Sequence, residues 1–410
     1  MVGRSALLKA FVLWMWTFFL FTGVAAGVEE ASTGEEKGIS SHFGHDVADS
    51  NRDGGNPSVS VGMGSSQDAF QAASNLTNVW NPLVERLASD GFDRDELRDL
   101  FSQPQVIFDR SPMVSKMDAL YQAKLLSEIV RPIQKRLVEL GYRPGPPDGV
   151  MGAETRRAIM AFQHVHGLAV DGKPAEDLLR RLEDERRQAP PNIEALDLPV
   201  EVMPMVYESV LQPERIGEAR DFLTRNKDIL SMVHKEYGVS PKVAVSLLAL
   251  ETRVGKYLGE KDALTTLSSM AMCTDFREIE PFLENQEIKV GLRAWLQKRC
   301  RQKADWAYEE LKALLRYAKN NQLSLIGLPG SSYGAIGICQ FMPTNALEYG
   351  VDGDGDGKVD LFEVEDALPS MGNFMRHHGW RKGISERKAL YHYNHSTIYV
   401  NTILALADQL

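Results

Sequence analysis

The spacing of apolar residues predicts a mainly helical chain. From Pro204 to the C-terminus, apolar residues recur at helical intervals and few runs alternate between apolar and polar positions. We therefore expect residues 204–410 to form one α-rich domain. Upstream, residues 78–128 predict further helices of this domain, since Trp80, Leu83 and Leu87 share one face and Asp93 is placed to open a second helix.

Residues 129–186 carry a separate pattern. A first helical stripe ends at Gly141, a turn rich in Pro and Gly follows at 144–149, and a second helix is expected from Ala153 to His166. Another turn at 167–172 precedes a third apolar stripe. The pattern predicts a small three-helix unit, joined to the main body by a Pro-containing linker at 187–203.

The first residues resemble neither pattern. Arg4 and Lys9 precede an uncharged stretch of 19 residues that ends in small side chains. This layout predicts a secretory signal peptide over residues 1–26. An uncleaved N-terminal membrane anchor is the alternative, because the stretch is close to the shortest that spans a bilayer. Residues 27–77 are rich in Gly, Ser, Asp and Asn and are expected to be a disordered tether. Both alternatives predict export to the periplasm, free or tethered to the membrane.

Charge and cysteine content narrow the class of protein. A net charge of −10 argues against a nucleic-acid binder, which would carry a basic face. Three cysteines fit an exported protein with few disulfides, and Cys273 and Cys300 could pair in an oxidising compartment. Spacing alone does not prove that pairing. Cys339 lies in a Gly-rich stretch and is expected to be a buried free thiol.

A candidate acid lies at the end of an apolar helix. Ser240 and Pro241 suit the N-cap and first helical positions, and residues 243–250 are almost wholly apolar before Glu251. A helix that is apolar on all sides is buried. Burial and the negative end of the helix dipole both favour the neutral carboxyl, which is the form a glycosidic general acid requires. Arg253 should point to another face, although a structural glutamate paired with an arginine is the alternative interpretation.

A second motif predicts a calcium site. Residues 352–363 fit the twelve-residue EF-hand loop, with Gly357 at the sharp bend and Val359 at the apolar eighth position. No second EF-hand is visible in the sequence, so we expect a structural ion that joins residues 330–343 to the helix carrying Met371, Phe374 and Trp380. The expected Ca²⁺ ligands are Asp352, Asp354, Asp356, the Lys358 carbonyl, Asp360 and Glu363.

Two other segments have compositions typical of sugar contacts. Residues 330–343 combine close-packing glycines with the amide of Gln340, and residues 391–397 place aromatic and amide groups together. The alternatives are a tight turn between helices for the first segment and a helix N-cap at Asn394 or Ser396 for the second.

These motifs carry two family resemblances. Residues 133–179 resemble the peptidoglycan-binding domain of wall enzymes, on the hallmarks Pro147-Asp148-Gly149, Gly152-x-x-Thr155, Phe162-Gln163 and Val170-Asp171-Gly172. Lys173-Pro174-Ala175 replaces a second Gly-x-x-Thr. Residues 78–125 and 200–410 resemble the membrane-bound lytic murein transglycosylase B family, with the binding domain inserted between its first helices and its core.

The second resemblance implies a lysozyme-like fold and a non-hydrolytic reaction on peptidoglycan glycan strands. Glu251 would be the sole acid/base, and Ser331, Gln340, Tyr393 and Asn394 would line the cleft and hold the N-acetyl sugar. Cys339 stands where the family commonly has a smaller residue. No organic cofactor is implied. Partners in the cell-envelope machinery cannot be identified from the sequence.

Two other functions compete with this one. A hydrolytic muramidase on the same scaffold would need a second carboxylate to activate water, for which Asp275 and Glu278 are candidates. A non-catalytic wall-binding scaffold predicts an eroded active site. Because Glu251, Gln340 and Asn394 all remain, the transglycosylase is favoured.

Overall fold

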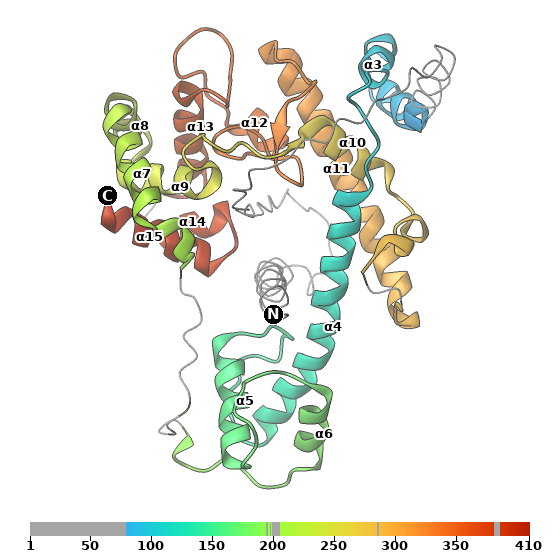
Figure 1. The fold of residues 1–410 in the computed structure, drawn as a ribbon, viewed down its shortest axis with the longest axis vertical. Helices are drawn as coiled ribbons and strands as arrows, with labels where there is room; N and C mark the ends of the chain where they lie inside the picture. Colours follow the sequence, from blue (N-terminus) through green and yellow to red (C-terminus); the bar gives the residue numbers. More distant parts are fainter. Residues whose placement is uncertain (1–78, 194–195, 197, 199–205, 285–286, 381–385) are drawn as a thin grey trace, which may run out of the picture. The chain divides into compact units, whose positions relative to one another are not determined.

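The computed structural model describes residues 79–193, 196, 198, 206–284, 287–380 and 386–410. The predicted signal peptide and tether, and part of the predicted linker, lie outside these residues. The described chain is mainly helical, as expected (Figure 1). Among the described residues, 116–198 form a smaller compact unit, and 79–115 together with 206–410 form a larger one.

The smaller unit has three helices around one apolar core. They are α4 (Ser111–Glu139), whose first residues belong to the larger unit, α5 (Ala153–Val165) and α6 (Glu176–Asp184). The predicted stripes meet inside it, since Ile133, Leu137, Phe162 and Leu182 are all 1% exposed or less. A unit of three helices has a small apolar core, so it also needs hydrogen bonds that stabilise the turns between them.

The first of these turns is held by a buried glutamine. Gln134 donates from Nε2 to Asp148 Oδ1 at 3.2 Å and to Thr155 Oγ1 at 3.0 Å, and its Oε1 accepts from Gly149 N at 2.7 Å. Gly149 takes a φ of 81°, which glycine adopts without strain. The family's hallmark residues in the first half of the smaller unit therefore form a hydrogen-bonded turn.

The second turn of the smaller unit is held by a glutamine in the same way. Gln163 donates from Nε2 to Asp171 Oδ1 at 2.8 Å, and its Oε1 accepts from Gly172 N at 2.9 Å. Asp171 Oδ1 also accepts from Lys173 N at 3.0 Å. The departure from Gly-x-x-Thr after Gly172 thus leaves this turn intact.

Replacing Gln134 with Leu should destabilise the smaller unit by about 2 kcal/mol, because the buried Gly149 N–H loses its acceptor. Hydrogen exchange of the full chain, read on peptides from residues 127–182, measures the loss of protection. Gln188→Leu changes an exposed glutamine of the same unit and should leave protection unchanged. Equal protection in the two variants would contradict a structural role for Gln134.

The larger unit contains the remaining elements. Its helices are residues 79–89, α3 (Arg94–Phe101), α7 (Pro213–Arg225), α8 (Lys227–Tyr237), α9 (Pro241–Thr252), α10 (Ala263–Met272), α11 (Arg293–Asn321), α12 (Pro343–Tyr349), α13 (Val364–His377), α14 (Glu386–Tyr393) and α15 (Thr397–Gln409). Short 3₁₀ helices are η3 (Glu208–Leu211), η4 (Phe276–Glu278), η5 (Glu280–Phe282) and η6 (Val290–Leu292). Strand β1 (Lys261–Asp262) pairs antiparallel with β2 (Pro329–Gly330), Lys261 lying opposite Gly330.

Helix α9 lies at the centre of this unit. It packs against α7, α8, α13 and α15, so elements from both ends of residues 206–410 meet around it (Figure 1). Val245, Leu247 and Leu248 are fully buried. The prediction of a buried helix, drawn from its apolar composition, is confirmed, and with it the start of the helix at Pro241.

The three cysteines are buried free thiols. The pairing of Cys273 with Cys300 is therefore not formed: Cys300 Sγ instead donates to the Cys273 carbonyl at 3.1 Å. Burial raises the pKa of both thiols to about 12, which keeps them in the unreactive protonated form. The expectation for Cys339 is confirmed.

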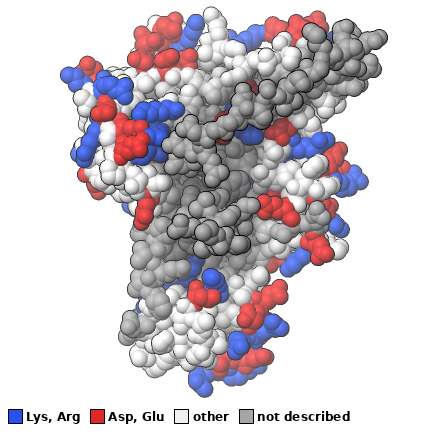
Figure 2. Space-filling view, in the orientation of Figure 1, with Lys and Arg blue, Asp and Glu red and all other residues white. Residues whose placement is uncertain are grey.

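Two further properties bear on the class of protein. Within the described residues, no helix combines the length and apolar character needed to cross a bilayer. On the face shown in Figure 2, acidic and basic side chains are interspersed over the described residues. That mixture fits the net charge of −10 and differs from the basic face of a nucleic-acid binder.

Candidate functional site

Glu251 ends the buried helix α9 with its carboxyl out of water. The residue is 4% exposed, and burial raises the pKa of its carboxyl to about 8. A hydrogen bond from Tyr399 Oη to Glu251 Oε1, at 2.5 Å, partly opposes that rise. The prediction that this carboxyl is buried is confirmed, and burial shifts its pKa toward the neutral form, in the direction expected. At neutral pH this group can donate a proton.

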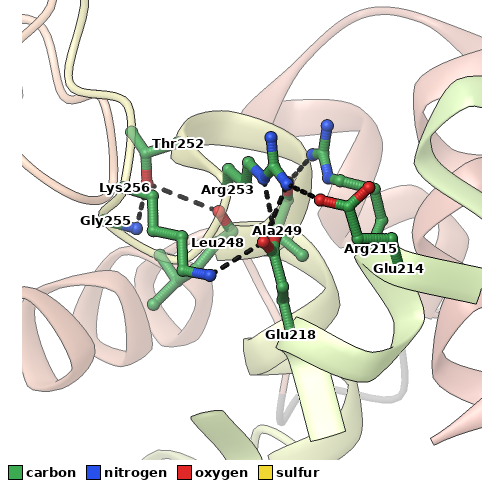
Figure 3. Close-up of polar contacts among 9 residues, drawn as sticks. All are labelled: Glu214, Arg215, Glu218, Leu248, Ala249, Thr252, Arg253, Gly255 and Lys256. Carbon is green, nitrogen blue, oxygen red and sulfur yellow. Dashed lines mark hydrogen bonds and ion pairs between the residues drawn. The ribbon is translucent and has the colours of Figure 1, made fainter. Parts of the chain in front are cut away.

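The alternative of an arginine pair is wrong for Glu251. Arg253 binds Glu214 and Glu218 on helix α7 instead (Figure 3). The helix ends at Thr252, because Arg253 takes a left-handed φ of 52°.

Tyr399 is the residue of this site that the sequence did not reveal. It lies in α15, 148 residues from Glu251, and is 1% exposed. Its helix begins at Thr397, and the Oγ of the preceding Ser396 accepts from Tyr399 N at 3.3 Å, so the N-cap predicted in residues 391–397 is Ser396. A tyrosine in an apolar helix gives no local signal of a polar partner. Only the packing of α15 on α9 brings the two together.

Replacing Tyr399 with Phe should raise the pKa of Glu251 further. The hydrogen bond favours the charged carboxylate, so its loss favours the neutral form and moves the basic limb of the pH–rate profile upward by about one unit. The profile of kcat on soluble glycan strands measures this shift. Tyr391→Phe, which changes a tyrosine that is 38% exposed, should leave the limb in place. A limb that stays or moves downward in the Tyr399 variant would refute the role.

The segment of residues 330–343, here called the Gln340 segment, lies against the end of α9. Thr252 Oγ1 donates to Ile338 O at 2.7 Å, next to Glu251 in sequence. Tyr393 Oη donates to Cys339 O at 2.5 Å from helix α14. The structure therefore joins the three segments that were predicted separately: the end of α9, the Gln340 segment and residues 391–397.

The side chains within the Gln340 segment hold its own turns. Gln340 has a φ of 50°, and its Nε2 donates to Gly337 O at 2.9 Å and Leu258 O at 3.3 Å. Ser331 Oγ accepts from Ala335 N at 2.9 Å. In the structure these two predicted sugar contacts shape the backbone of the segment.

The predicted contacts in residues 391–397 are buried. The Tyr393 ring stacks with the Tyr399 ring, their centroids 6.5 Å apart, and Tyr393 is fully buried. Asn394 follows α14 and is 6% exposed. Tyr393 thus packs behind Tyr399 and supports the position of its hydroxyl.

The predicted calcium loop brings carboxylates together. Oxygens of Asp352, Asp354 and Asp356 lie within 4.8 Å of one another, and Gly357 has a φ of 88° at the bend. Asp360 and Glu363 are not part of that close group. Asp360 Oδ1 accepts from Phe362 N at 2.9 Å, and Glu363 precedes α13 at its N-cap position.

Asp366 holds this loop and was not identified from the sequence. Its carboxyl, in a residue 4% exposed, accepts from Gly353 N at 2.7 Å and from Asp360 N at 2.6 Å. Burial raises its pKa. The loop is also tied to the Gln340 segment, because Ile338 N donates to Leu361 O at 2.8 Å. Hydrogen bonds of the loop thus connect that segment to α13, which carries Asp366, whereas the connection through a calcium ion stays a prediction.

Two family models match parts of this chain. Residues 201–388 match the family model "Transglycosylase SLT domain", and residues 127–182 match "Putative peptidoglycan binding domain". Membrane-bound lytic murein transglycosylase B of Escherichia coli strain K12 is 28% identical over 173 residues, which are 42% of this chain and 41% of that protein. N-acetylmuramoyl-L-alanine amidase CwlM of Mycobacterium tuberculosis is 39% identical over 62 residues, 15% of each chain. The chain thus spans less than half the length of these curated relatives.

Solved structures of lytic transglycosylases are also similar. Soluble lytic transglycosylase SltB1 of Pseudomonas aeruginosa is 21% identical with a TM-score of 0.41, covering 62% of this chain and 97% of that one. The Escherichia coli lytic transglycosylase Slt35, in complex with calcium, is 19% identical with a TM-score of 0.41, covering 62% and 92%.

Proposed function

We propose that this chain, in which residues 201–388 belong to the transglycosylase SLT family and residues 127–182 to a peptidoglycan-binding family, is a peptidoglycan lytic transglycosylase. It would cleave the β-1,4 bond between N-acetylmuramic acid and N-acetylglucosamine without water. The observation that carries the proposal is the Glu251 carboxyl, buried at the end of α9 with a pKa of about 8 and a tyrosine hydroxyl as its partner.

One carboxyl can run both halves of this reaction. Glu251 donates its proton to the glycosidic oxygen as the bond from the muramyl C1 breaks, and the substrate's own N-acetyl group stabilises the positive centre. The Glu251 carboxylate then accepts the proton of the muramyl 6-hydroxyl as that oxygen attacks C1. The result is a 1,6-anhydromuramic end and a regenerated acid. The Tyr399 hydroxyl stabilises the carboxylate between the two steps.

The surroundings of Asp275, one of the two candidates for a second carboxylate, favour this reaction over hydrolysis. A hydrolase needs a second carboxylate to act on water. Asp275 is bound to Arg277 at 2.5 Å and caps η4, which packs on α11. That carboxylate therefore binds groups of its own turn, which favours a role in structure over one in activating water.

Substrate contacts are proposed from the same segments. Ser331 and Gln340 would act by fixing the backbone of the Gln340 segment against the sugar, and Tyr393 by supporting Tyr399. Asn394, at the end of α14, would present its amide to the N-acetyl group. The smaller unit would hold the glycan strand, and the protein would work in the periplasm after export.

Calcium is proposed as a structural ion. The clustered oxygens of Asp352, Asp354 and Asp356, around a left-handed glycine, are the donor type that Ca²⁺ prefers. The Lys358 carbonyl, Asp360 and Glu363 would complete the set. When bound, the ion supplies a cross-link of the loop and no chemistry of the reaction. The residues of the loop and Asp366 keep the Gln340 segment joined to α13.

Digestion of purified sacculi tests the function. Mass spectrometry of the muropeptides released by the full chain should show 1,6-anhydromuramic ends, lighter by one water than hydrolysed products. Hydrated reducing ends would identify a muramidase. A chain that binds sacculi and releases nothing would be the non-catalytic scaffold.

A further inference from the structure

The turn that follows Glu251 has an unfavourable backbone. Arg253 and Val254 take φ angles of 52° and 54°, and Gly255 follows with 87°. Side chains other than glycine are strained in this left-handed region. Such a conformation persists only where the surrounding structure holds it. Since this turn fixes where the last residues of α9 point, whatever holds it also positions Glu251.

A single glutamate on helix α7 binds both cations of this turn (Figure 3). Glu218 accepts from Arg253 Nε at 2.6 Å and from Arg253 Nη2 at 2.7 Å, and from Lys256 Nζ at 2.8 Å. The pair with Arg253 is bidentate, which fixes the guanidinium in direction as well as distance. The Glu218 side chain is only 14% exposed, so solvent screens these contacts less than those of a surface pair.

Two neighbours on α7 complete the arrangement. Glu214 accepts from Arg253 Nη2 at 2.5 Å, but its side chain is 76% exposed and its contribution is correspondingly weaker. Arg215 is buried and donates from Nη2 to Ala249 O at 2.6 Å, satisfying a carbonyl in the last turn of α9. Helix α7 thus holds the end of α9 on one side, and the Gln340 segment binds it through Thr252.

Glu251 faces neutral groups on its other sides. Tyr399 of α15, Tyr393 of α14, Cys339 of the Gln340 segment and Tyr207 before η3 all lie close enough to interact with its charge. Among the described residues, the charged groups that bind the end of α9 and its turn are Glu214, Arg215 and Glu218 of α7, with Arg253 and Lys256 of the turn itself. Burial and the Tyr399 hydrogen bond, and neither of the turn's two cations, determine the pKa of Glu251.

We propose that Glu218 is a positioning residue for the Glu251 carboxyl: it binds Arg253 and Lys256 on the α7 side of the turn and keeps both cations away from the acid. The inference rests on the proposed function, in which Glu251 donates the proton. A guanidinium released two residues from Glu251 would favour its carboxylate form. Less of the enzyme would then carry the proton at neutral pH.

The pH dependence of kcat on soluble glycan strands tests this role in the full chain. Glu218→Gln should move the basic limb of the pH–rate profile downward by about half a pH unit, because Arg253 loses its less exposed anionic partner and keeps only Glu214. The double variant Glu218→Gln with Arg253→Gln should return the limb to its wild-type position. Glu280→Gln is the matched control, since that side chain is 21% exposed and pairs with Arg293 at 2.8 Å elsewhere in the unit. Its limb should not move.

A limb that stays in place in Glu218→Gln, or a double variant that keeps the shifted limb, would overturn the proposal. If Glu218→Gln does not fold, Glu214→Gln is the test. It should move the basic limb downward by a smaller amount, and a limb that does not move would overturn the proposal. A wild-type chain that forms no anhydro ends would refute the proposed function and this inference together. If the wild type forms anhydro ends and Glu218→Gln has the same pH profile as the wild type, this inference alone is refuted.

Discussion

Replacing Glu251 with Gln should lower kcat on peptidoglycan by about a thousandfold or more, while binding to sacculi stays unchanged. Gln keeps the size of the side chain and can still accept from Tyr399, but it has no proton to give to the glycosidic oxygen. It also cannot take the proton of the 6-hydroxyl afterwards. Because one group serves as acid and base, both steps are lost together.

Glu310 provides the matched control for that experiment. It is 5% exposed on α11, burial raises its pKa, and it accepts from Thr344 N and Oγ1, both at 2.9 Å, at the start of α12. Glu310→Gln should keep kcat, since the amide oxygen still accepts from Thr344 N and the amide nitrogen donates to Thr344 Oγ1. Comparable losses of kcat in the two variants would mean that buried carboxyls matter for folding and that Glu251 is not the acid.

Adding millimolar calcium to the chelator-treated protein should raise the melting temperature of the larger unit by about 5 °C. For an isolated extracellular EF-hand-type site with a dissociation constant of about 10⁻⁴ M, calcium at about 3 mM contributes about 2 kcal/mol by mass action, which sets the size of the shift. Differential scanning calorimetry with and without chelator measures it, and magnesium should give a much smaller rise.

The loop itself supplies the control variants. Asp354→Asn removes one of the three clustered carboxylates and should abolish the calcium response. Asp95→Asn, at a side chain 89% exposed on α3, should leave it intact. A wild-type melting temperature indifferent to calcium would show that this loop is an acidic turn without an ion.

Local patterns predicted the position and the protonation of the candidate acid. The buried helix, its start at Pro241 and the neutral form of Glu251 all follow from residues adjacent in sequence, because apolar periodicity and burial are local consequences of composition. The spacing of Asp352, Asp354 and Asp356 predicted their clustering for the same reason.

The groups that hold those side chains depend on contacts between distant segments. Tyr399 reaches Glu251 across 148 residues, and Glu218 reaches Arg253 across 35. No local pattern reports such contacts, which arise only when α15 and α7 pack on α9. Asp366 lies just beyond the loop motif, and its role is set by the fold of the loop over α13. Glycines and an amide in the Gln340 segment suggested contacts with a sugar. In the structure Ser331 bonds within the segment, and Gln340 bonds within it and to Leu258 O.

The most direct test of the central claim is digestion of sacculi by the wild-type chain in water enriched in ¹⁸O, followed by mass spectrometry of the new glycan ends. If Glu251 delivers the muramyl 6-hydroxyl to its own C1, the new muramic ends carry no ¹⁸O and lack one water. Ends that have gained one ¹⁸O would show that water is the nucleophile, and would contradict a transglycosylase run by a single carboxyl.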